Sequence, residues 1–278
     1  MLAENGYGKS GIRLVKLIRR DGRHEVRDLT VAVRLEGDFE AAHVAGDNAA
    51  VLPTDTMKNT VYALAKDRFD GAIESFALVL CRHFLESAPA VTRAIVEISE
   101  RAWERLHAGG GPHPHAFSRP GVERRVCRVE RGTGEATVRA GLEDLTVLKS
   151  AQSGFAGFLR DRYTTLKETS DRIFATAIRA LWLYRGTDIA FDETFSEIRR
   201  TLLEVFATHD SASVQHTLHA MGEGVLENHR EVSEIRLTLP NKHHIPVDLS
   251  AFGLQNDNEI FVATEEPFGL IEATLRRS

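Results

Sequence analysis

The chain has 278 residues, with 35 Lys and Arg against 40 Asp and Glu, so its formal net charge at pH 7 is −5. A hydrophobic content of 42% beside 27% charged residues is ordinary for a globular protein and excludes the disordered and collagen-like classes. The mild acidity argues against nucleic-acid binding, which needs a basic face. No stretch approaches the roughly 20 consecutive apolar residues of a membrane span.

The cysteine content and the chain ends favour a reducing compartment. Two cysteines, Cys81 and Cys127, exclude a disulfide framework and a thiolate zinc site. The first ten residues lack the apolar core of a secretory signal. The last residues, Leu275-Arg276-Arg277-Ser278, differ from the peroxisomal Ser-Lys-Leu signal. We therefore expect a cytoplasmic protein.

Hydropathy periodicity predicts six elements in the first half of the chain, in the order strand, strand, helix, helix, strand, strand. Asp21-Gly22 forms the predicted turn between the first two strands. The predicted segments are 11–18, 26–35, 55–66, 73–85, 91–103 and 124–130.

The second half shows a similar set of elements: two strands, two helices and two strands. Recurrence at half the chain length predicts two tandem domains, 1–134 and 135–278, joined near Gly132-Thr133-Gly134. Antiparallel strands with helices on one face make the fold class α+β, and unpaired sheet edges favour oligomerisation. The predicted segments are 136–148, 173–184, 195–207, 214–227, 232–239 and 260–263.

Two patterns suggest other functions, nucleotide binding and metal binding, but their sequence context does not support either. The string Gly6-Tyr7-Gly8-Lys9-Ser10-Gly11 matches a dinucleotide fingerprint, but that motif must follow a strand and open a helix, and here a strand follows it. His113 and His115 lie among prolines in a predicted loop, and His243 and His244 point to opposite faces of an extended segment. Neither pair has the ligands to complete a metal site.

Several motifs, spread in order along the chain, resemble the urate oxidase (uricase) family, and their specificity lies in the combination. The matching segments are Tyr7-Gly8-Lys9, 51–60, His113-Pro114-His115, 145–150, 157–161, 163–169, 211–215 and 239–243.

This resemblance implies two tandem tunnelling-fold (T-fold) domains, each an antiparallel four-stranded sheet with helices on one face. It also implies a homotetramer whose active sites are shared between subunits, with neither metal nor organic cofactor. The implied reaction oxidises urate with dioxygen and water to 5-hydroxyisourate and hydrogen peroxide. Because the peroxisomal tripeptide of eukaryotic members is missing, we expect a bacterial or engineered origin.

The resemblance assigns Lys9, Thr54 and His243 to a catalytic proton relay. From the residues alone, Thr54 follows Pro53 at a strand-to-helix turn, with Asp55 or Thr56 as the predicted cap. The positive end of a helix dipole is a suitable place for an anion. A lysine acts as a base only if its surroundings lower its pKa toward neutrality. From the residues alone, the alternative for Lys9 is a solvated surface lysine.

The other implied site residues bind the substrate. The Arg172 guanidinium suits two adjacent acceptors on a planar anion, and the Gln215 amide matches a carbonyl beside an N–H. By resemblance, Asn241 lies above the ring where dioxygen binds. The alternatives from the residues alone are a strand-end ion pair for Arg172 and core packing for the apolar members. The implied substrate-binding set is Thr54, Asp55, Phe155, Leu166, Arg172, Val214, Gln215 and Asn241.

Two other function classes remain as alternatives. One is a different tunnelling-fold protein that binds a purine or pterin, although such enzymes grip the base with a carboxylate and often use zinc. The other is a purely structural tetramer, which would not require Lys9, Arg172 and Gln215 together. Loss of urate absorbance in air, with peroxide formation, separates both from a urate oxidase.

Overall fold

A long antiparallel hairpin opens the computed structural model, which describes residues 2–277. Strands β1 (Tyr7–Arg20) and β2 (Arg23–Gly37) turn at Asp21-Gly22, as predicted, with Gly22 at a positive φ of 68°. Both strands extend beyond their predicted bounds. The string that resembles a dinucleotide fingerprint lies largely in β1, so the sequence-based rejection of that motif is confirmed.

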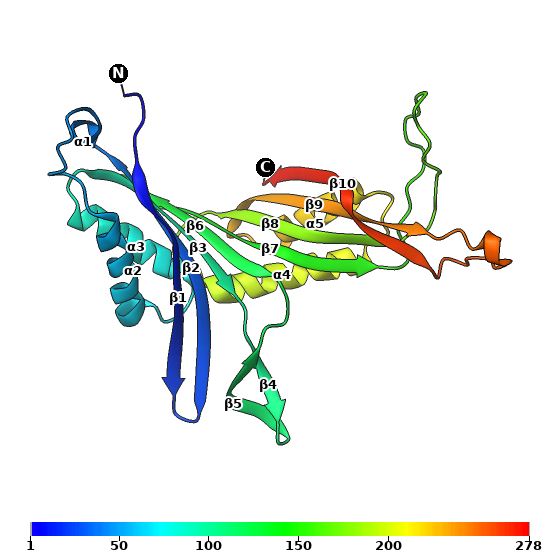
Figure 1. Ribbon diagram of the computed structural model, residues 1–278, viewed down its shortest axis with the longest axis horizontal. Helices are drawn as coiled ribbons and strands as arrows, with labels where there is room; N and C mark the ends of the chain where they lie inside the picture. Colours follow the sequence, from blue (N-terminus) through cyan, green and yellow to red (C-terminus); the bar gives the residue numbers. More distant parts are fainter. Residues whose placement is uncertain (1, 278) are drawn as a thin grey trace. The chain divides into compact units, whose positions relative to one another are not determined.

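The chain separates into two compact units, one comprising residues 1–141 and 183–195 and the other residues 142–182 and 196–278. In the first unit the strand order is β1-β2-β3-β6, and each neighbouring pair is antiparallel. Helices α2 and α3 cover one face of this sheet (Figure 1). The elements after β2 are α1 (Glu40–Val44), α2 (Thr54–Arg68), α3 (Ile73–Ser87), β3 (Val91–Arg101) and β6 (Arg124–Arg131).

A hairpin between β3 and β6 departs from the predictions. Strands β4 (Glu104–Ala108) and β5 (Gly111–Ser118) pair with each other, and Figure 1 shows this hairpin projecting from the sheet. His113 and His115, predicted to lie in a loop, are in β5. Two prolines in this strand obscured its alternation, since proline is uncommon in strands except at edges.

The strands of the second unit follow the order β7-β8-β9-β10, with β9 and β10 antiparallel; the first residues of β7 and α4 and the last residues of β8 belong to the first unit. Helix α5 packs on β9 and β10. Strands β9 and β10 run well past the predicted segments 232–239 and 260–263. The elements are β7 (Thr137–Lys149), β8 (Phe174–Tyr184), α4 (Phe191–Thr208), α5 (Val214–Asn228), β9 (Val232–Pro246), η1 (Ser250–Phe252) and β10 (Phe261–Arg276).

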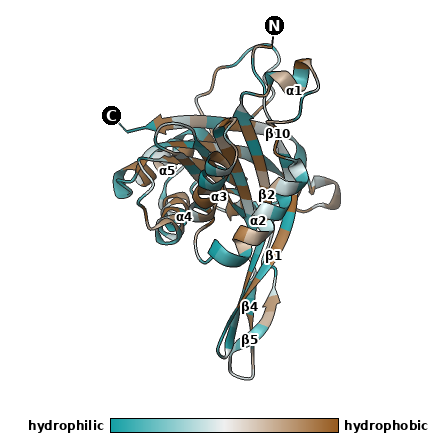
Figure 2. Cartoon of the chain, turned by 90° about the vertical axis from the view of Figure 1, so that its left-hand side faces the viewer, coloured by the Kyte–Doolittle hydropathy of each residue, from teal (hydrophilic) through white to brown (hydrophobic). Residues whose placement is uncertain are grey.

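Each core forms where the apolar stripe of a helix meets the buried face of a strand. Phe76 and Leu80 of α3 are fully buried and face a sheet whose β2 alternates strictly at Leu29, Val31 and Val33. Figure 2 shows this alternation of hydrophobic and hydrophilic residues along the strands. The two periods, 3.6 in helices and 2 in strands, explain why sequence patterns located these elements.

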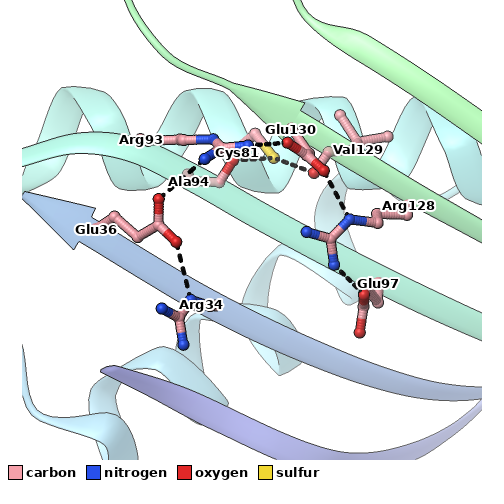
Figure 3. A network of polar contacts seen from close by, with 9 residues as sticks. All are labelled: Arg34, Glu36, Cys81, Arg93, Ala94, Glu97, Arg128, Val129 and Glu130. Carbon is pink, nitrogen blue, oxygen red and sulfur yellow. Dashed lines mark hydrogen bonds and ion pairs between the residues drawn. The ribbon is translucent and has the colours of Figure 1, made fainter. Parts of the chain in front are cut away.

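The face of the first sheet away from α3 carries a continuous chain of ion pairs across three strands (Figure 3). Arg93 binds Glu36 of β2 at 3.1 Å and Glu130 of β6, and Arg128 binds Glu130 at 2.7 Å and Glu97. On the opposite face, the Cys81 thiol of α3 donates to the carbonyls of Ala94 and Val129, both at 3.6 Å. The sheet therefore has one apolar and one charged face.

A buried ion pair links α3 to β6. Arg125 Nη2 lies 2.6 Å from Glu74 Oε2, and the Glu74 side chain is 0% exposed. Burial raises the pKa of the Glu74 carboxyl, and this effect exceeds the opposing attraction of Arg125. Arg125 also binds Asp192 and lies 4.5 Å from the centre of the Phe195 ring.

Replacing Arg125 with Met is expected to lower the free energy of unfolding by about 3–5 kcal/mol, because it leaves the Glu74 charge buried without its partner. Urea unfolding at fixed protein concentration measures this loss. The matched double variant Glu74→Gln, Arg125→Met should recover part of it, because no buried charge remains. If the double variant were less stable than Arg125→Met, desolvation of Glu74 would not be the cause.

His229, at the end of α5, is expected to make the second unit sensitive to acid. Its side chain is buried, and its Nε2 lies 3.0 Å from Thr201 Oγ1. Burial lowers the pKa of His229 despite the opposing charge of Glu231. The unfolded chain therefore binds this proton first, so the free energy of unfolding should fall as pH drops below the unfolded value of about 6.5.

Urea unfolding of wild type and His229→Gln at pH 7.5 and pH 5.5 checks this. The variant should lose less stability than wild type between the two pH values. An equal loss in both proteins would assign the acid sensitivity to other groups.

Candidate functional site

A cavity of about 350 Å³ lies in the second unit, beside β9 and the irregular segment that follows β7. That size suits a small-molecule ligand. Five of the site residues expected from the sequence line it: Phe155, Leu166, Arg172, Asn241 and His243. Further lining residues are Lys167, Glu168, Thr169, Asp171, Ile173, His244, Ile245, Pro246, Asn258 and Phe261.

Arg172 supplies a positive charge at this cavity. Its Cζ lies 5.2 Å from the centre of the Phe155 ring, and its buried Nε has no hydrogen-bond partner among the described residues. Burial lowers the pKa of Arg172, but a guanidinium stays charged at neutral pH. A buried charged donor without a partner favours an anionic ligand that would complete it.

Backbone hydrogen bonds hold Arg172 and Phe155 together within a segment that lacks regular structure. Phe155 N–H donates to the Thr169 carbonyl at 2.7 Å, and Thr169 N–H donates back at 3.1 Å. The Arg172 N–H donates to the Ser153 carbonyl at 2.8 Å. Main-chain hydrogen bonds thus fix the backbone positions from which the aromatic ring and the guanidinium project.

A second aromatic ring backs the first and was not among the expected site residues. Phe158 stacks on Phe155 with ring centres 4.9 Å apart and planes 13° from parallel. Arg160 lies 4.9 Å from the centre of the Phe158 ring. The Phe-x-x-Phe spacing was the available signal, but spacing carries little information outside a regular helix or strand.

Strand β9 contributes Asn241 and His243 to the cavity, as their shared face predicted. His244 also contributes atoms to the cavity wall, together with Ile245 and Pro246. Asn241 pairs with Gly269 and His243 with Thr264, on either side of an irregularity in the β9–β10 register. The extra residues of this irregularity lie in β10, between Thr264 and Gly269.

Val214 and Gln215 begin helix α5 and are not among the residues lining this cavity. Ser213 is the N-cap, and its side chain accepts from the His216 N–H at 3.1 Å. The segment before the helix is joined to the cavity wall, because Gly154 N–H donates to the Ser211 carbonyl at 2.8 Å. The N–H groups of Val214 and Gln215, which precede His216 in the first turn of α5, have no intrahelical acceptor by helix geometry.

The first unit holds Lys9, Thr54 and Asp55. Thr54 is the first residue of α2, and the N-cap is Pro53, without a side-chain cap. The prediction that Asp55 or Thr56 caps the helix is therefore wrong, because both lie inside its first turn. The Asp55 carboxylate binds Lys58, and Asn59 Nδ2 donates to it at 3.1 Å.

Lys9 lies near this helix start. The pKa of Asp55 is lowered mainly by the hydrogen bond and charge of Lys58, and the positive charge of Lys9 contributes. Among residues 2–277 the Lys9 ammonium has no ion pair within 4.0 Å. A cation and a hydroxyl at a helix N-terminus are the kinds of group that proton transfer uses.

Fold and site together define an antiparallel α+β protein with a cavity lined by an aromatic ring and a guanidinium. The family model described as Uricase matches residues 5–130 and 138–272. The uricase of Arthrobacter globiformis is 48% identical over 277 residues, covering 100% of this chain and 90% of the relative. The uricase of Danio rerio is 39% identical over 278 residues, covering 98% and 93%.

A solved structure agrees with these sequence relatives. The crystal structure of the Arthrobacter globiformis uricase has a TM-score of 0.95 at 48% identity, covering 100% of this chain and 95% of that one. The chain belongs to the uricase family, so the resemblance expected from its sequence motifs is confirmed. It is an enzyme, an oxidoreductase, and the expected T-fold class is confirmed as well.

Proposed function

We propose that this uricase-family enzyme oxidises urate with dioxygen and water to 5-hydroxyisourate and hydrogen peroxide, using neither metal nor organic cofactor. The observation that carries the proposal is the cavity where the Arg172 guanidinium lies over Phe155 beside Asn241 and His243, with its Nε lacking a hydrogen-bond partner among the described residues. Urate is a planar anion, which suits a guanidinium fork and an aromatic platform.

The binding residues hold urate in one orientation. Arg172 and the Gln215 amide grip the ring edge over Phe155, with Leu166 as a wall and the Val214 N–H as a further donor. A carboxamide presents both a donor and an acceptor, so Gln215 matches a carbonyl beside an N–H on urate. Asp55 and Thr54 complete the binding set from the start of α2.

In the proposed chemistry the protein residues transfer protons and form no covalent bond to urate. Lys9, Thr54 and His243 remove a proton from bound urate, and the resulting electron-rich dianion reduces dioxygen by one electron. Superoxide recombines with the urate radical and the relay returns a proton, which gives a hydroperoxide at a ring-fusion carbon, below the space that Asn241 covers. Peroxide leaves, and water activated by the same relay adds there. The enzyme contributes positioning, charge stabilisation and proton transfer.

The proposed assembly is a homotetramer with active sites shared between subunits. The edge strands β1 and β10 are 14 and 16 residues long, and long unpaired edges favour pairing with another copy. Leu159 is 95% exposed and Tyr163 72% exposed, in the segment that carries Phe155. Such exposed apolar side chains support burial against a partner subunit.

The proposed domain boundary and compartment follow from separate observations. The two matched segments of the family model, 5–130 and 138–272, support tandem domains of 1–134 and 135–278.

No helix in the described part of the chain is long and apolar enough to cross a membrane. Cys81 and Cys127 are free and buried, which is compatible with a reducing bacterial cytoplasm.

The test mixes the purified protein with urate and follows loss of the urate absorbance band together with peroxide formation. Both should occur in air, survive exhaustive chelation and stop without dioxygen. Urate binding without oxidation would instead favour another purine- or pterin-binding tunnelling-fold protein. Activity that is lost with a stoichiometric metal and restored by it would overturn the cofactor-free mechanism.

A further inference from the structure

The phenol of Tyr7 connects the start of β1 to the turn before α2. Its Oη accepts a hydrogen bond from the backbone N–H of Leu52 at 2.8 Å. The Tyr7 ring packs edge-on against Phe39, with centres 4.8 Å apart and planes at 87°, and Phe39 is only 1% exposed. A buried neighbour thus fixes the ring, and the ring fixes the position of its hydroxyl.

The hydrogen bond of the Leu52 N–H attaches the turn before α2 to strand β1. Residues 48–52 have no regular structure, and among their hydrogen bonds in the described chain this is the one that reaches a strand. Leu52 lies two residues before Thr54, and Pro53 between them has a restricted φ of −55°. Anchoring Leu52 therefore anchors the first residue of α2.

Tyr7 and Lys9 share one side of β1, because side chains two apart in a strand point the same way. Between these two residues β1 packs tightly against β2. A Cβ added to Gly8 would lie 2.0 Å from the Val33 carbonyl oxygen. Immediately after Lys9 the β1–β2 register shifts, with Gly11 at a positive φ of 69°. Bulges of this kind redirect nearby side chains.

We infer that Tyr7 is a positioning residue for the Lys9–Thr54 relay, its phenolic oxygen holding the N-terminus of α2 against the strand that carries Lys9. This inference rests on the proposed function. The phenol acts through Leu52 and touches neither the substrate nor the transferred proton. Proton transfer depends steeply on donor–acceptor distance, so a small displacement of Thr54 slows the reaction more than it weakens urate binding.

The test compares Tyr7→Phe, which keeps the ring on Phe39 and removes the acceptor, with Tyr62→Phe. Tyr62 is a matched control, because its phenol also links α2 to β1. It lies on α2 and donates an exposed, long hydrogen bond of 3.4 Å to the Arg13 carbonyl of β1. Tyr7→Phe should lower kcat by roughly 10-fold to 100-fold, with KM within about twofold. Tyr62→Phe should match wild type.

A double-variant cycle separates positioning from a general structural role. In a Lys9→Met background, where the relay is already broken, Tyr7→Phe should cause little further loss of kcat. Equal fold losses in both backgrounds, or a wild-type kcat for Tyr7→Phe, would overturn the inference. If wild type itself did not oxidise urate, the failure would belong to the proposed function.

Amide hydrogen exchange read by mass spectrometry tests the attachment independently of activity. The peptide containing Leu52 should exchange faster in Tyr7→Phe than in wild type, and Tyr62→Phe should leave it unchanged. Unchanged exchange in Tyr7→Phe would show that the phenol does not hold this turn, and would overturn the inference even if activity fell.

Discussion

Replacing Lys9 with Met is expected to lower kcat by about 10²–10⁴-fold, the usual contribution of a positioned acid–base group. Met has a similar length but carries no proton, so the start of β1 keeps its packing. Because Lys9 is assigned to proton transfer, KM for urate should change little. Steady-state kinetics over a range of urate concentrations measures both constants.

Arg172→Lys provides the contrasting variant. It keeps the positive charge and loses the planar two-pronged donor, so KM should rise and kcat should fall together. The open Nε of Arg172, next to Phe155, is the group that a lysine does not replace. Indistinguishable kinetic profiles for the two variants would refute the division between proton transfer and substrate binding.

Mixing two inactive variants is expected to restore activity. Lys9→Ala and Arg172→Ala should each be nearly inactive alone. If a site takes Lys9 from one subunit and Arg172 from its neighbour, co-refolding equal amounts yields about one quarter intact sites under random assembly. If both residues came from one chain, every site would carry a lesion and no activity would return.

The control for this experiment refolds each variant alone, in parallel and at the same total concentration. Mixing the two native variants without unfolding is a second control, because subunits that do not exchange should stay inactive. A recovery equal to the sum of the pure variants would contradict shared sites. Size measurement of each refolded sample establishes that the compared assemblies are the same.

Local patterns in the sequence determined most regular elements. The stripe of α3, from Ile73 through Phe84, and the alternation of β2 from Leu29 to Val33 predicted both elements near their observed positions. These patterns are reliable because one face of each element is buried, which imposes its period on the sequence. Strand β10 was underestimated because its exposed and partly buried residues do not alternate.

For the candidate site, too, the sequence determined one part and the tertiary structure another. The sequence motifs identified the family and nominated residues such as Phe155, Arg172 and Asn241. Only the tertiary structure brought these three around one cavity, stacked Phe158 on Phe155, and left the Arg172 Nε without a hydrogen-bond partner in the described part of the chain. The physical reason is that main-chain hydrogen bonds between distant residues, such as Phe155 with Thr169 and Leu52 with the Tyr7 phenol, leave no periodic signal in the sequence.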